Sequence, residues 1–180
     1  MATVSDADIV SALKENLESG FRLLMAKYRE PVYWHIRRLV VSHDDAQDAA
    51  QETFIRAFRS LGRFKGECSL GAWIYRIATN EALRAIERRR GGRVSLDDAD
   101  AGAGRLAADG YVDYSDLEAV KLQNAILSLP TKQQLAFNLR YYDGLEYDEI
   151  AAVTGSTAAS AKANYHVAKE KIIKYMNSTI

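Results

Sequence analysis

The residues best able to take part in chemistry lie on one polar face of a segment in the first half of the chain. If residues 44–60 form a helix, five side chains share the face opposite its apolar stripe: Asp48, Gln51, Glu52, Ile55 and Arg56. Asp48 and Glu52 are like charges one turn apart, which destabilises an isolated helix by about 0.2–0.5 kcal/mol. A basic partner surface would offset this repulsion. The alternative is a solvated face on which Arg56 balances Glu52.

Catalytic chemistry has no comparable support in the sequence. No nucleophile–base pair, phosphate-binding loop or metal-ligand spacing is visible. Cys68 is the single cysteine, so no disulfide forms within the chain, and His35, His43 and His166 are scattered. We therefore expect no enzyme activity, no cofactor, no metal and no small-molecule substrate.

Charge is balanced over the whole chain but not along it. The 180 residues include 24 Lys and Arg and 24 Asp and Glu, which argues against binding nucleic acid by overall charge. Residues 1–93 carry a net charge of +4, residues 94–116 of −5 and residues 117–180 of +1. Five of the 11 glycines lie between 91 and 110. We interpret 94–116 as a flexible acidic linker between two small domains, 1–93 and 117–180.

No targeting or membrane segment is evident. The N-terminus lacks the basic and apolar regions of a signal peptide. No window approaches the roughly 18 apolar residues of a membrane span. Cytoplasmic localisation is the expectation.

Both halves are predicted to be all-α. Prolines occur only at positions 31 and 130, and no segment alternates as a strand does. After a first helix opened by Ser5 and Asp8, we expect helices at about 17–28, 31–41, 44–60, 70–90, 116–127, 130–143, 145–154 and 157–175. The clearest is 44–60, whose apolar stripe is predicted to be core: Ala46, Ala49, Ala50, Thr53, Phe54, Ala57 and Phe58. The last two helices, with a turn near Gly155, have the order of a helix-turn-helix, and an ordinary helical hairpin is the alternative.

Six runs of residues, in a fixed order on both sides of the linker, carry a family resemblance. They are DAQDAAQETFIRAF at 45–58, FKGECS at 64–69, WIYRIATN at 73–80, LSLP at 127–130, LRYYDGL at 139–145 and YDEIA at 147–151. Each run is weak alone, but their order and spacing together are specific. In these runs the chain resembles the extracytoplasmic-function (ECF) sigma factors of bacterial RNA polymerase, the smallest members of the sigma-70 family.

The resemblance implies a transcription initiation factor without catalytic chemistry. Its two domains would be sigma region 2 and sigma region 4, which direct core polymerase to the −10 and −35 promoter elements and open the strands. The polar face at Asp48, Gln51 and Glu52 would dock on the clamp helices of the largest polymerase subunit, and region 4 would contact the flap of the second-largest subunit. A membrane-bound anti-sigma factor is a further partner that the family suggests.

For the −10 element, the resemblance implies a loop that captures a flipped base and a helix that contacts the melted strand. A flipped base needs an apolar wall and polar partners for its edge. Ten residues are candidates: Phe64, Lys65, Gly66, Glu67, Cys68, Ser69, Arg76, Asn80, Arg84 and Arg88. The alternative is a solvent-facing amide for Asn80.

For the −35 element, the final helix departs from the family pattern. Many members carry arginine where this chain has Asn164, Val167 and Lys169. The remaining candidates are Ser156, Thr157, Ser160, Lys162, Asn164, His166, Lys169 and Lys171. Asn can bind adenine through two hydrogen bonds, and Lys can reach guanine or phosphate, so we expect an unusual, A/T-richer −35 sequence.

A helix-turn-helix regulator that acts without docking on polymerase is the alternative function. The first half has no evident effector pocket and does carry the docking pattern, which favours the sigma factor. The regulon and the inducing signal are not encoded in any pattern we can interpret.

Overall fold

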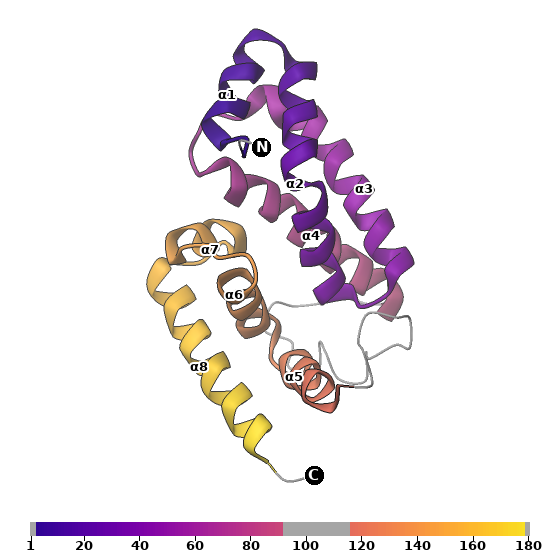
Figure 1. Cartoon of the computed structure of the whole chain (residues 1–180), viewed down its shortest axis with the longest axis vertical. Coiled ribbons are helices and arrows are strands. Elements are labelled where there is room, and N and C mark those ends of the chain that lie inside the picture. The colour runs from indigo at the N-terminus through magenta and orange to yellow at the C-terminus, as the bar shows by residue number, and fades with distance from the viewer. Residues whose placement is uncertain (1–2, 92–115, 179–180) are drawn as a thin grey trace.

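The structure is a computed structural model that describes residues 3–91 and 116–178. The described residues form α-helices and one short 3₁₀ turn, with no strand among them (Figure 1). The elements are α1 (Asp6–Glu15), α2 (Leu17–Val40), α3 (His43–Ser60), η1 (Leu61–Arg63), α4 (Leu70–Arg90), α5 (Leu117–Leu127), α6 (Thr131–Tyr141), α7 (Tyr147–Thr154) and α8 (Ala158–Asn177). The all-α prediction is confirmed, and the linker predicted at 94–116 lies, except for Asp116, outside the described residues.

Local signals set most helix ends where the sequence predicts them. The Ser5 side chain accepts a hydrogen bond from the Asp8 amide at 3.1 Å, and the Asp8 carboxylate accepts one from the Ser5 amide at 2.9 Å, which is a capping box. Thr157 caps α8 by accepting from the Ser160 amide at 3.1 Å. Gly155 ends α7 with φ of 66°, in the left-handed region that favours glycine.

One boundary prediction is wrong. Two helices were expected on either side of Pro31, but α2 runs through it from Leu17 to Val40. Proline removes one backbone donor and disfavours a helix interior by about 3 kcal/mol. Leu24, Tyr28, Val32, Ile36, Leu39 and Val40 are buried along α2 on both sides of the proline. Burial of this continuous stripe outweighs the local preference.

The apolar stripe of α3 is core along most of its length. Ala46, Ala49, Thr53, Phe54 and Ala57 are buried, as predicted. Ala50 is half-buried, and the core prediction is wrong for Phe58, which is 44% exposed. Phe58 lies in the last turn of α3, where its ring meets that of Phe21 of α2 edge-on at 5.0 Å between centroids. It lines a surface groove between α2 and α3 instead of entering the core.

The two domains pack against each other. Figure 1 shows α6 and α7 of the C-terminal domain facing α2 and α4 of the N-terminal domain. Leu139, Ile150 and Val153 belong to the same buried cluster as Ile36 and Ile74. A smaller cluster between α5, α6 and α8 completes the C-terminal domain. The sequence predicted both domains but contained no sign that they share a core.

Candidate functional site

An apolar groove of about 1300 Å³ runs between α2 and α3. Trp34, Ile55 and Phe58 line it with 42%, 38% and 44% of their surface exposed. Large apolar side chains exposed together mark an interaction surface more often than isolated ones do. Asp48 and Gln51 lie on its border, and both are exposed. The structure therefore places three of the five predicted docking residues, Asp48, Gln51 and Ile55, beside this groove.

The other two docking candidates point toward α4. The Glu52 carboxylate is 3.2 Å from Arg56 Nε, as the solvated-face alternative expected. Arg56 Nε also lies 2.7 Å from a carboxylate oxygen of Glu81, a residue that sequence reasoning missed. Glu81 is buried, and its presence at the α3–α4 contact has no signal in the helical pattern.

The helix α4 presents a straight polar stripe. Arg76, Asn80, Arg84 and Arg88 are all exposed and follow one another at intervals of four residues. This spacing keeps side chains on one side of a helix. Arg84 also binds Glu81, and Arg89, one position beyond the stripe, pairs with Asp45 of α3 at 2.9 Å. Three guanidinium groups and an amide on one line suit contact with a phosphate backbone and a base edge.

The loop before α4 has an aromatic wall. The rings of Phe64 and Trp73 lie 5.4 Å apart between centroids, and Trp73 is half-buried rather than fully in the core. Lys65, Gly66 and Glu67 are exposed. Gly66 has φ of 77°, which a side chain would strain. Cys68 is half-buried, and burial raises the pKa of its thiol, so it is not activated as a thiolate.

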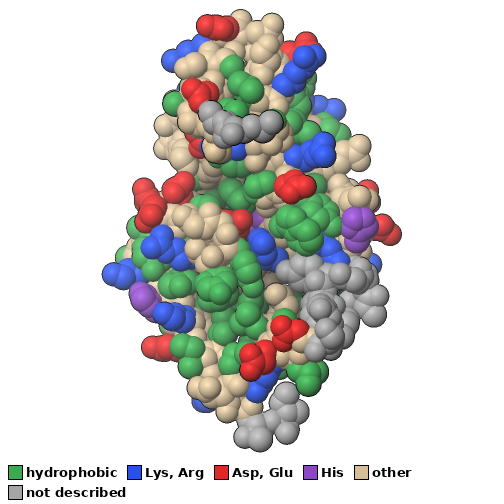
Figure 2. Space-filling model, viewed as in Figure 1, with side chains coloured by type: hydrophobic (Ala, Val, Ile, Leu, Met, Phe, Trp, Pro, Cys, Tyr) green, Lys and Arg blue, Asp and Glu red, His purple; other side chains and the backbone are tan. Residues whose placement is uncertain are grey.

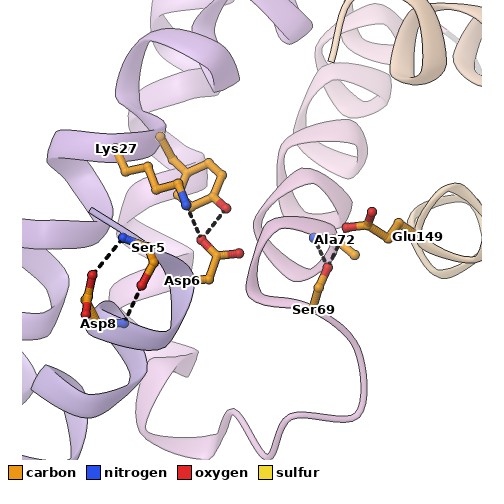
Figure 3. A network of polar contacts seen from close by, with 8 residues as sticks. Ser5, Asp6, Asp8, Lys27, Ser69, Ala72 and Glu149 are labelled. Carbon is orange, nitrogen blue, oxygen red and sulfur yellow. Dashed lines mark hydrogen bonds and ion pairs between the residues drawn. The ribbon is translucent and has the colours of Figure 1, made fainter. Parts of the chain in front are cut away.

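Ser69 links the loop to the C-terminal domain. Its hydroxyl accepts a hydrogen bond from the Ala72 amide at 3.1 Å, which caps α4. The same hydroxyl donates to the carboxylate of Glu149 on α7 at 2.8 Å (Figure 3). Figure 3 also shows the Lys27–Asp6 ion pair and the Ser5–Asp8 capping box on the neighbouring side of the N-terminal domain. Ser69, one of the predicted −10 residues, therefore contacts the C-terminal domain.

A second contact between the domains centres on Asp143, in the turn after α6. The Tyr75 hydroxyl of α4 donates to its carboxylate at 2.9 Å. His35 Nδ1 and an Arg38 guanidinium nitrogen, both on α2, lie 3.8 and 3.9 Å from it. Burial raises the pKa of Asp143 to about 6, against the opposing effects of Tyr75 and Arg38. Burial, and then Arg38, lower the pKa of His35 to about 3, so the His35–Asp143 contact is not an ion pair near neutral pH.

The predicted −35 residues are not on one face of α8. At 3.6 residues per turn, Ser160, Asn164 and Lys171 lie on one flank, and Lys162, His166 and Lys169 lie on the other. Asn164 Nδ2 is 3.5 Å from the Ser160 hydroxyl, whereas the three side chains of the second flank are exposed. Figure 2 shows basic side chains and a histidine along the edge formed by α8, beside an apolar surface of the same domain.

Three of the −35 candidates have partners within the domain. Lys171 Nζ donates to Gln133 of α6 at 2.9 Å. Ser156 is hydrogen-bonded to Thr154 at 2.8 Å, and Thr157 is the cap of α8. Their side chains therefore stabilise the turn and the helix.

Nothing in the described ranges adds a metal site or a membrane span. No group of three or more His, Cys, Asp or Glu side chains is placed to hold a metal ion within residues 3–91 and 116–178. Over the same residues, every helix is too short or too polar to cross a bilayer.

Comparison with known proteins places the chain in a family. Residues 24–91 match Sigma-70 region 2, and residues 119–172 match Sigma-70, region 4. The RNA polymerase sigma-H factor of Pseudomonas aeruginosa is 32% identical over 181 residues, which cover 94% of this chain and 92% of that protein. The ECF RNA polymerase sigma-E factor of Escherichia coli K12 is 31% identical over 179 residues, covering 94% and 93%.

Solved structures agree in fold. The sigma factor RpoE in complex with the anti-sigma factor NepR from Bartonella quintana has a TM-score of 0.70 at 22% identity, over 89% of this chain and 98% of that one. CnrH in complex with the cytosolic domain of CnrY has a TM-score of 0.69 at 20% identity, over 96% of both chains.

Two helical domains with these matches define a sigma factor, a class of proteins that is non-enzymatic. The chain belongs to the sigma-70 family, in its ECF group, and directs transcription initiation by RNA polymerase.

Proposed function

We propose that the groove between α2 and α3 is where this sigma factor docks on the clamp helices of core polymerase. The observation that carries the proposal is the exposure of Trp34, Ile55 and Phe58 next to Asp48. Apolar anchors supply most of the affinity of an interface, while rim charges set specificity and association rate. Glu52 and Arg56 belong to the edge of this surface that borders α4.

The −10 element is bound by the loop and the polar stripe of α4. Phe64 and Trp73 offer an aromatic wall for an unstacked base, and Asn80 can both donate to and accept from its edge. Arg76, Arg84 and Arg88 follow the strand as phosphate contacts. The loop directly precedes α4 in the chain, so one single strand could pass from the loop to the stripe.

The −35 element is read by α8, and region 4 contacts the polymerase flap. Because α8 has two polar flanks, one reads base edges and the other contacts phosphates. Asn164 is the residue suited to adenine, and Lys162 and Lys169 suit phosphate. Polymerase and promoter are both in the cytoplasm, which is where the protein would act.

An anti-sigma factor is the remaining partner in the proposal. In the two solved structures named above, RpoE is in complex with the anti-sigma factor NepR, and CnrH is in complex with the cytosolic domain of CnrY. The exposed groove offers a partner helix the same apolar anchors that it offers polymerase.

The decisive experiment is assembly with core polymerase. Asp48→Lys should weaken core binding by about tenfold, as expected when a close interfacial charge pair becomes repulsive. Glu15→Lys makes the same charge reversal at an exposed site on α1, away from the groove, and should bind core as the wild type does. Equal core affinity for Asp48→Lys and Glu15→Lys would contradict the docking assignment.

Strand opening tests the −10 assignment separately. Asn80→Ala holoenzyme should show fewer permanganate-reactive thymines near −10 and keep its −35 footprint, because Asn80 lies on α4 and not on α8. A strong footprint by the free protein, with no opening when polymerase is added, would instead favour a regulator that works without polymerase.

A further inference from the structure

A buried carboxylate joins the two helices that carry the proposed docking and −10 surfaces. Glu81 is 2% exposed, although it directly follows the exposed Asn80 on α4. One of its oxygens, Oε1, accepts from Arg56 Nε of α3 at 2.7 Å and also from Arg84 of α4. The guanidinium-bearing side chains stay 46% and 48% exposed. Each arginine is therefore held at one nitrogen while the rest of the group faces solvent.

The energetics make this arrangement more than a surface ion pair. An ionised carboxylate that is buried costs several kcal/mol unless its charge is paired and hydrogen-bonded, so Glu81 depends on both arginines. A guanidinium has five N–H donors, and one bond to Glu81 leaves the others available for a phosphate. A side chain that is already fixed loses less rotamer entropy when it binds.

We propose that Glu81 is a positioning residue for promoter opening: it holds Arg84 in line with Arg76, Asn80 and Arg88 on the strand-binding face of α4. The inference rests on the proposed function, since it requires this stripe to contact promoter DNA. The hollow of about 360 Å³ between α3 and α4, bordered by both arginines and by Glu81, is the place where the two surfaces meet.

Two explanations of Glu81 predict effects of opposite sign. As a negative charge beside DNA, Glu81 would weaken binding, and its removal would strengthen promoter contacts. As a positioning residue, it strengthens contacts, and its removal would weaken strand opening. A variant without the charge therefore separates electrostatics from positioning by the direction of change alone.

The test uses holoenzyme saturated with each variant, on a promoter that the wild-type holoenzyme selects from a library. Glu81→Met keeps the length and helix preference of the side chain but removes the hydrogen bonds to both arginines. Loss of the charge-assisted bond that holds Arg84 should lower permanganate-detected opening about tenfold. Glu81→Gln keeps a neutral acceptor and should lose less. Glu87→Gln removes one charge from the same helix and should open promoters as the wild type does.

A double variant makes the result specific to Arg84. In an Arg84→Met background, Glu81→Met should cause little further loss, because the residue it positions is already gone. Losses that add in full would show that Glu81 acts only through the stability of α4 and would overturn the inference. If Arg84→Met lowers opening but Glu81→Met leaves it unchanged or raises it, the positioning role is wrong and the −10 assignment stands. If Arg84→Met has no effect, both are wrong.

Discussion

The two domains of this sigma factor hold their surface charges in different ways. In the N-terminal domain, charges are tied across helices: Glu81 holds Arg56 and Arg84, and Asp45 holds Arg89. In the C-terminal domain, the exposed Lys162 and Lys169 of α8 form no ion pair with any residue of the described range 116–178. If the proposed −10 and −35 assignments hold, Arg84 of the −10 surface is positioned before DNA arrives, whereas the α8 lysines would become ordered only on the DNA.

The domains also differ in what their contact with each other covers. On the N-terminal side it uses the start of α4 and buried groups of α2, close to the proposed −10 loop. On the C-terminal side it uses α7 and the turn at Asp143, and leaves α8 exposed. Three buried polar atoms in this contact, on His35, Arg38 and Asp143, have no hydrogen-bond partner among the described residues. Unsatisfied groups make an interface easier to open.

The largest expected effect concerns the core that the domains share. Ile36→Ala and Leu139→Ala each truncate a side chain that is essentially fully buried, and each should lower the free energy of unfolding by about 2–5 kcal/mol. Because both residues belong to one cluster, either change should shift the melting of both domains in calorimetry. Two separate transitions, each sensitive to only one substitution, would show that the domains fold independently.

The next effect concerns pH and Asp143. Its pKa is raised from 3.8 to about 6 in the packed state, so its contribution to packing is complete below pH 3.8 and is lost as the pH rises through 6. Asp143→Asn should therefore favour the packed state by about 3 kcal/mol at pH 7 relative to the wild type, and by little at pH 4. Small-angle scattering from the full chain across this range would measure the change in compactness.

The effects of the other charged and titratable groups that face Asp143 must be distinguished from the effect of its own titration. His35 and Arg38 of α2 and Tyr75 of α4 all point at it. The pKa of His35 is lowered to about 3, so a His35 exposed by domain separation would gain a proton below its ordinary pKa of 6.5 and oppose packing in acid. The difference between wild type and Asp143→Asn removes this common effect. If the difference in compactness between wild type and Asp143→Asn does not change with pH, the raised pKa of Asp143 does not control domain packing.

A smaller effect should distinguish the two flanks of α8. In the holoenzyme, Asn164→Ala should reduce discrimination at one −35 base pair by about 1–3 kcal/mol. Lys162→Ala should weaken binding to all sequences alike and lower the salt dependence by about one phosphate contact. Competition binding on a set of −35 variants would measure both. Equal behaviour of the two variants would contradict the division of α8 into a base-reading flank and a phosphate-contacting flank.

The smallest effect is expected at Ser69, where the domains meet. Ser69→Ala removes the cap of α4 and should cost about 1 kcal/mol of stability, measured by urea denaturation. Glu149→Gln keeps that cap, keeps an oxygen that can accept from the Glu146 amide in the capping box of α7, and weakens the hydrogen bond between the domains, so its cost should be smaller. If Glu149→Gln costs as much as Ser69→Ala, the bond across the domains is the stronger of the two contacts.

Prediction from sequence succeeded where the cause is local. The capping box at Ser5, the cap at Thr157 and the glycine at 155 fix helix ends through contacts within four residues. It failed at Pro31 and Phe58, where packing against other helices decides the outcome. The site shows the same contrast. The α4 stripe follows from four-residue spacing, but Arg56, which binds Glu81, lies on another helix, and Glu149, which binds Ser69, is 80 residues away in the chain.

The sequence by itself determined that this protein is an all-α sigma factor with two domains, because helix periodicity and caps are local and the six family runs lie in order along the chain. Only the tertiary structure decided which polar side chains are held and by what. The burial of Glu81 and Asp143 depends on where α3 and α4, or α2 and α6, meet in space. The free energy of a charge depends on its surroundings in three dimensions. Helical periodicity predicts only which residues lie on the same face of a helix.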